Sequence, residues 1–131
     1  QDALQKMELL ENYSIEWHFI GRLQSNKTAT IADKFSWVHT LDNEKHARRL
    51  SVQRPEDHPP LQVCIQLNLS GEKSKGGIRE EELREFATAI DSLPGLRLRG
   101  LMTMPDPNST LKQQEAVYRR LAELKEGLNR R

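Results

Sequence analysis

The fold of this chain is decided by the stretch Trp17-His18-Phe19-Ile20-Gly21-Arg22-Leu23-Gln24-Ser25-Asn26-Lys27. Residues 16–20 form a short apolar run, which is typical of a β-strand, and Gly21 then opens a polar turn. Ser25 or Asn26 is predicted to cap the following helix, because its side-chain oxygen can accept a hydrogen bond from a free N–H of the first turn. A strand that feeds a helix through a short loop is half of a βαβ unit, and such loops lie where parallel sheets bind ligands.

The same strand–helix pattern recurs along the chain. The predicted strands are residues 15–20, 37–41, 61–69 and 96–103. A lead helix is predicted over residues 3–10. One further helix follows each strand: residues 26–35, a charged segment capped by Asp42 or Asn43, residues 80–93, and a last segment from Thr110 to Leu128. Alternating strands and helices predict an α/β fold with a parallel sheet. A complete (β/α)₈ barrel needs roughly 250 residues, so four units predict half of a TIM-type barrel, a single partial domain over residues 1–131.

The third strand shows which side of the sheet is polar. Apolar residues occupy every odd position from Leu61 to Leu69, and we expect them to pack under helices. The residues between them, which face the other way, are Gln62, Cys64, Gln66 and Asn68. A sheet covered by helices on both sides would be apolar on both faces. The polar face therefore predicts a barrel interior or a ligand pocket.

The helices present apolar faces at helical spacing. The residues expected to be buried are Ala29, Ile31, Ala32 and Phe35 in the first of the four, Ala47 and Leu50 in the second, Leu83, Phe86, Ala87 and Ile90 in the third, and Val117, Leu121, Leu124 and Leu128 in the last. Three prolines predict a loop over residues 53–60. Pro94-Gly95 is predicted to end the third helix. Thr110 and Gln113 are predicted to form a capping box at the start of the last helix.

Composition excludes several classes of protein. The 20 basic and 19 acidic side chains nearly balance, which gives no basis for a nucleic-acid or membrane partner. The single cysteine, Cys64, cannot form an internal disulfide and suits a reducing compartment, so the predicted location is cytoplasmic. Gln1 is not an initiator methionine, and both ends look cut, so we expect a fragment of a longer protein.

Several motifs together resemble one known family, the pyridoxal phosphate homeostasis proteins, which are single-domain relatives of the alanine racemase barrel. The resemblance covers nearly the whole chain. It rests on the opening stretch and on Val38-His39-Thr40-Leu41-Asp42, Gln66-Leu67-Asn68-Leu69-Ser70, Ser74-Lys75-Gly76-Gly77-Ile78 and Leu98-Arg99-Gly100-Leu101-Met102-Thr103-Met104-Pro105.

The resemblance implies a (β/α)₈ barrel that holds pyridoxal 5′-phosphate (PLP) as a Schiff base on a lysine. Proteins of this family have no established catalytic turnover and act in vitamin B6 and amino-acid homeostasis. The chain would correspond to the third through sixth strands. The family's cofactor lysine, on the first strand, and its phosphate-gripping segments, on the seventh and eighth, would then lie outside this sequence.

The predicted cofactor-binding residues are His18, Asn68, Met102 and Lys75. Each has a structural alternative. His18 is equally well explained as a hydrogen-bonded barrel histidine, Asn68 as a partner of Gln66 within a barrel layer, and Met102 as core filler. Lys75 is the candidate for a secondary, weaker capture of PLP, because an aldehyde reacts with any accessible unprotonated amine; the alternative is a solvated polar loop.

No catalytic residue and no metal site is predicted. His18 and His39 lie on consecutive strands, but no cysteine cluster or second carboxylate accompanies them to complete a zinc site. Cys64 has no base visibly paired with it and is expected to be a small buried residue rather than a nucleophile.

Three functions remain open at this point. The first is a non-catalytic PLP-binding carrier or regulator. The second is an amino-acid racemase-like PLP enzyme, which would need a second catalytic base opposite the lysine. The third is an interaction module without a ligand. Because four parallel strands in a half-barrel leave two unpaired edges, self-association is also expected.

Overall fold

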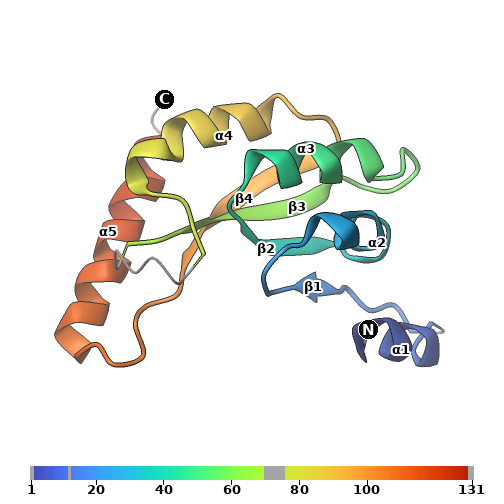
Figure 1. Ribbon diagram of the computed structural model, residues 1–131, viewed down its shortest axis with the longest axis horizontal. Helices are drawn as coiled ribbons and strands as arrows, with labels where there is room; N and C mark the ends of the chain where they lie inside the picture. Colours follow the sequence, from blue (N-terminus) through green and yellow to red (C-terminus); the bar gives the residue numbers. More distant parts are fainter. Residues whose placement is uncertain (1, 12, 70–75, 130–131) are drawn as a thin grey trace.

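The computed structural model describes residues 2–11, 13–69 and 76–129. One sheet contains β1 (His18–Phe19), β2 (Trp37–Leu41), β3 (Leu61–Leu67) and β4 (Leu96–Thr103) in sequence order, and every neighbouring pair is parallel. The helices α2 (Thr28–Lys34), α3 (Glu44–Gln53) and α4 (Leu83–Asp91) cover one face of this sheet (Figure 1). The predicted α/β half-barrel is confirmed, and β2 and β4 have the predicted bounds.

The core lies between the sheet and these three helices. Leu61, Val63, Ile65 and Leu67 are at most 1% exposed, as the alternation along the third strand predicts. The four predicted residues of α4 and the predicted Ala47 and Leu50 of α3 are buried as well. Ala29 is exposed, contrary to prediction, because α2 turns only Thr28, Ile31 and Ala32 toward the core.

The helix starts depend on side chains near each turn. Of the two residues expected to cap α3, Asp42 or Asn43, the cap is Asn43: its Oδ1 accepts hydrogen bonds from the backbone N–H of Lys45 at 2.8 Å and of His46 at 3.3 Å. The predicted cap of α2 by Ser25 or Asn26 is wrong. A 3₁₀ turn, η1 (Ser25–Lys27), precedes α2, and no side chain caps either element. The Ser25 hydroxyl is instead hydrogen-bonded to His46 Nε2 at 3.2 Å.

The two remaining helices lie at opposite ends of the sheet (Figure 1). α5 (Leu111–Asn129) opens with the predicted capping box, in which Thr110 Oγ1 accepts from Gln113 N and Gln113 Oε1 accepts from Thr110 N. Leu121, Leu124 and Leu128 pack on the core but stay partly exposed. At the other end, Ala3 and Met7 of α1 (Asp2–Leu9) pack at the edge of the core.

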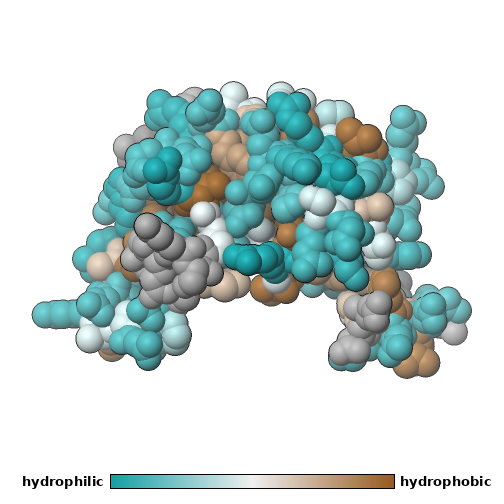
Figure 2. All heavy atoms as spheres, in the orientation of Figure 1, coloured by the Kyte–Doolittle hydropathy of each residue, from teal (hydrophilic) through white to brown (hydrophobic). Residues whose placement is uncertain are grey.

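The molecule has the shape of an arch. The uncovered face of the sheet forms its hollow underside, between α1 and α5 (Figure 2). Strand β1 is only two residues long, shorter than predicted, because only Trp37 and Val38 of β2 pair with it. Within the described ranges, every helix is too short or too polar to cross a membrane.

Candidate functional site

A cleft of about 750 Å³ lies at the carboxyl ends of the strands. All four βα segments contribute to it, so it is built by the sheet as a whole. Its lining residues are Gly21, Arg22, Leu23, Thr40, Asp42, Asn43, His46, Gln66, Gly76, Met104, Pro105 and Pro107. This position agrees with the prediction that the loop after the first strand borders a ligand site.

One wall of the cleft is held by a contact between two loops. The Asp42 carboxylate, just beyond β2, accepts a 2.7 Å hydrogen bond from the backbone N–H of Gly77. A Cβ on Gly76 would lie 2.9 Å from Asp42 Oδ2, and one on Gly77 would lie 2.7 Å from the carbonyl carbon of Leu67. Gly77 also has a φ of +116°, which side-chain-bearing residues rarely adopt. The close approach of the two loops therefore requires both glycines.

The same segment continues the sheet for a short distance. Ile78 N donates to Gln66 O at 2.9 Å, and Asn68 N donates to Ile78 O at 2.8 Å. Residues 76–78 therefore run beside the end of β3 and bury the side chain of Gln66, which is 7% exposed.

The cleft contains one buried polar atom that the described part of the chain leaves without a partner. His46 Nδ1 is buried and accepts or donates no hydrogen bond among the described residues, while its Nε2 bonds Ser25. Gln66, with a buried carboxamide, and Arg22, with an exposed guanidinium, line the same cleft. Buried polar groups are normally satisfied, so His46 Nδ1 indicates a place where a polar ligand or water binds.

The uncovered face of the sheet carries a group of rings from β1 and β2. The rings of His18, Trp37 and His39 lie nearly parallel, with centroids 5.2–5.4 Å apart. The Arg99 guanidinium lies 5.8 Å from the Trp37 ring centroid. Glu16 Oε1 accepts a hydrogen bond from Trp37 Nε1 at 2.9 Å and lies 3.3 Å from His18 Nε2. The face opposite the helices is therefore polar and aromatic, as the third strand predicts.

The predicted site residues are not all brought together. His18 pairs with Trp37, the first residue of β2, so it lies at the level of the amino ends of its neighbours and not at the cleft. Asn68 follows β3 directly and bonds the segment 76–78. Met102 lies opposite Gln66 on the neighbouring strand. Lys75 lies outside the described residues. Asn68 and Met102 thus flank the cleft, whereas His18 stands apart from it.

Cys64 behaves as the sequence predicts. Its side chain is buried on β3 opposite Gly100, and burial raises the pKa of the thiol, while the nearby Arg99 lowers it in part. The thiol is therefore protonated near neutral pH. A protonated thiol is a poor nucleophile.

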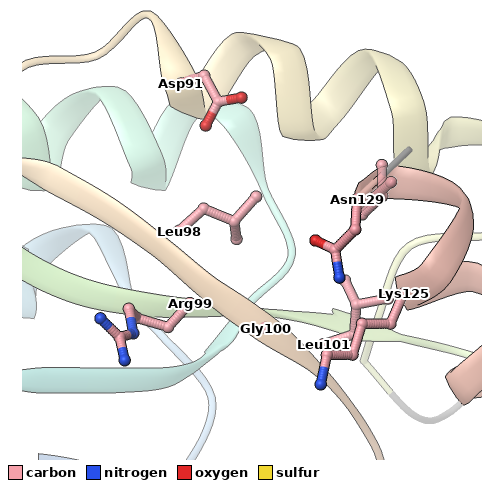
Figure 3. Close-up of a pocket in the computed structure, with 8 residues that line it drawn as sticks. Asp91, Leu98, Arg99, Gly100, Leu101, Lys125 and Asn129 are labelled. Carbon is pink, nitrogen blue, oxygen red and sulfur yellow. The ribbon is translucent and has the colours of Figure 1, made fainter. Parts of the chain in front are cut away.

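A second, smaller pocket of about 340 Å³ lies between α4, β4 and α5 (Figure 3). Leu98 in this view points toward α4, and the amide of Asn129 and the amine of Lys125 project from α5. The pocket opens on the edge of β4 that pairs with no other described strand. It marks an unpaired sheet edge rather than a site with converging functional groups.

Reasoning from the sequence missed Arg22, Thr40, Asp42 and His46 as cleft residues. A signal for Asp42 was present, because it follows β2 directly, as Asn68 follows β3. The glycine pair at 76–77 was a second signal, since adjacent glycines indicate close backbone approach. Their connection to Asp42 spans 35 residues, which no local pattern predicts.

The comparisons with known proteins point to one group. The pyridoxal phosphate homeostasis protein of Pseudomonas aeruginosa is 51% identical over 129 residues, covering 98% of this chain and 56% of that protein. The protein of the same name from Escherichia coli K12 is 48% identical over 130 residues, covering 99% and 56%. The chain thus spans about half the length of the curated relatives it matches.

Solved structures of related proteins have the same fold as this chain. PipY of Synechococcus elongatus superposes with a TM-score of 0.92 without PLP (27% identity) and 0.89 with PLP bound (26% identity). Both matches cover 99% of this chain, and they cover 61% and 60% of PipY. Alanine racemase of Clostridium difficile, at 14% identity and a TM-score of 0.73, shares the fold. The alanine racemase N-terminal domain model matches residues 7–131, and the chain belongs to that family.

Proposed function

We propose that this chain is a sector of a PLP-binding barrel protein that acts in vitamin B6 and amino-acid homeostasis without catalysing a reaction. The observation that carries the proposal is the likeness to PipY with PLP bound, which extends over 99% of this chain. The names of the curated relatives support the same role and describe homeostasis proteins rather than enzymes.

The residues at the carboxyl ends of the strands fit one wall of a PLP site. Gln66 offers a buried carboxamide that can donate and accept, and Arg22 offers a positive charge suited to a phosphate. Met104 and Pro105 supply apolar surface against which a pyridine ring packs. When bound, PLP supplies an aldehyde that combines with amines.

We assign contacts with the cofactor to Asn68 and Met102, which flank the cleft, and to His18 on the inner face. In this arrangement the protein's side chains orient the cofactor and exclude water from it. The resemblance to the homeostasis proteins assigns the attaching lysine to a segment outside this sequence.

Equilibrium dialysis against PLP tests the assignment. Asn68→Ala and Met102→Ala are each expected to weaken binding by roughly three- to tenfold, the loss of one hydrogen bond or of part of an apolar contact. Asn108→Ala, in an exposed turn, is the matched control and should bind as the unmodified chain does. Equal binding by all three variants contradicts the assignment.

Lys75 is proposed as a weaker, secondary point of PLP capture. Borohydride reduction after incubation with PLP fixes the cofactor to the amine it has joined, and mass spectrometry then locates it. Lys75→Ala is expected to remove one modified peptide, whereas Lys112→Ala, on exposed α5, should leave that peptide in place. An unchanged pattern of adducts in Lys75→Ala rules the capture out.

The absence of catalysis is tested separately. The chain is incubated with PLP and L-alanine, and D-alanine is followed by chiral chromatography. We expect no D-alanine above the level formed by PLP alone. A higher rate favours the racemase-like alternative, for which the likeness to alanine racemase gives the fold only.

A further inference from the structure

We propose that His18 and His39 form a one-proton switch, which holds β1 on the edge of the sheet near neutral pH and loosens it when the solution becomes acidic. The switch lies on the uncovered face of the sheet, outside the cleft, and it is argued and tested for the chain without PLP.

The two imidazoles are bonded directly to each other. His18 Nδ1 lies 2.9 Å from His39 Nε2, which is a hydrogen-bonding distance for two ring nitrogens. One nitrogen must carry the proton and the other must present its lone pair. On its far side, His18 Nε2 lies 3.3 Å from Glu16 Oε1, an acceptor. This contact favours the tautomer with the His18 proton on Nε2, so His39 Nε2–H is the donor between the rings.

This arrangement accepts one proton but not two. The first proton goes to His39 Nδ1, which keeps His39 Nε2–H as the donor, so the bond between the rings survives. A second proton would have to go to His18 Nδ1, where it would face the N–H of His39. Two N–H groups cannot bond each other, and two cations would lie side by side. The doubly protonated pair therefore has to separate.

Charged groups of both signs surround the pair. Arg99 lies over Trp37 in the same group of rings, and Arg97 lies on the same face, because it pairs with Gln62, which pairs with Trp37. Both positive charges disfavour a second proton, whereas the Glu16 carboxylate, in contact with His18 Nε2, favours a proton on the pair; the nearby Cys64 is a neutral thiol. Burial and the neighbouring His18 both lower the pKa of His39.

The lowered pKa of His39 gives the sign of the pH effect on stability. Since the pKa of His39 is lower in the folded protein than in an unfolded chain, the unfolded chain binds more protons around that range. The stabilisation that the neutral pair gives the fold is therefore complete above the ordinary histidine pKa of about 6.5, and it is lost as the pH falls through the lower folded pKa of His39. The rings separate only when the second proton follows.

Strand β1 is the element that would respond. It pairs with β2 through only two residues. Its other links include Trp17 O, which accepts from Ser36 N and Trp37 N, Thr40 Oγ1, which donates to Gly21 O, and Trp37 Nε1, which donates to Glu16. The Phe19 ring also packs edge-on against Phe35. Because these links remain at low pH, the expected response is a local loosening of residues 15–21, not global unfolding.

Hydrogen exchange read by mass spectrometry tests the switch, on the chain without PLP. Between pH 8 and pH 5, after correction for intrinsic exchange, residues 15–21 should lose protection by roughly two- to tenfold, the range expected for one hydrogen bond. His39→Gln keeps a donor to His18 but does not titrate, so it should abolish the loss. His58→Gln, whose ring contacts Asp33 and Asp57 instead, should retain it.

Proton uptake is measured by NMR of the imidazole nitrogens. We expect one ring of the pair to become charged while the protection of residues 15–21 persists, and the second only as that protection is lost. His18→Gln provides a second variant and should also abolish the response. The proposal is overturned if His39→Gln or His18→Gln keeps the wild-type response, or if both rings become protonated with protection unchanged.

Discussion

At the scale of single residues, the structure depends on a few positions where only one side chain fits. Gly77 combines a φ of +116° with backbone closer than any Cβ allows, and Asp42 fills the space left by the neighbouring glycine. The cap of α3 could be narrowed to Asp42 or Asn43 from the sequence, because a cap acts within three residues. Ser25 could not, because its hydroxyl bonds His46, 21 residues away.

A Gly77→Ala substitution tests whether position 77 requires glycine. The new methyl group collides with the end of β3 and adopts an unfavourable φ, so we expect a loss of about 1–3 kcal/mol in the free energy of unfolding. Urea denaturation measures the change. Gly127→Ala in α5, where a Cβ meets nothing within 4 Å, is the control and should stabilise the chain by up to about 1 kcal/mol. If Gly77→Ala is as stable as the wild type, residue 77 does not lie as close to the end of β3 as described.

At the scale of elements, local patterns predicted the three longer strands of the sheet. The bounds of β2 and β4 were right, and the buried face of β3 was right, since each is encoded by neighbouring residues. The length of β1 was wrong, because it depends on how long β2 stays beside it. The level of His18 in the sheet, opposite Trp37, was not predictable for the same reason: the stagger between strands is a tertiary property.

A Leu50→Ala substitution tests the packing of α3. Leu50 is fully buried, so its removal leaves a cavity and should lower the free energy of unfolding by about 2–5 kcal/mol. Val52→Ala in the same helix, at a position 85% exposed, should change stability by less than about 0.5 kcal/mol. Thermal or urea unfolding compares the two. A small effect at Leu50 would mean that α3 is not docked as described.

At the scale of the whole molecule, the number and order of the strand–helix units were predictable, whereas the walls of the cleft were not. The units follow from periodicity along the chain. The cleft joins loops that only the completed sheet brings together, so Arg22 and His46 could be recognised only from the structure.

We expect the chain to self-associate, because the described sheet has β1 and β4 as unpaired edges and a face without helices. Sedimentation velocity over a range of concentrations should show a population of dimers or larger species that grows with concentration. A single monomeric species at every concentration, with cooperative unfolding, would contradict this expectation.

The cleft is assembled from four separate connections, each anchored to its own strand. The connections after β2 and β3 are joined by the hydrogen bond from Gly77 to Asp42, and Ser25 after β1 bonds His46 in α3. Substitutions at these joints alter two walls at once, so a library that redesigns the cleft has to randomise Asp42 together with residues 76 and 77.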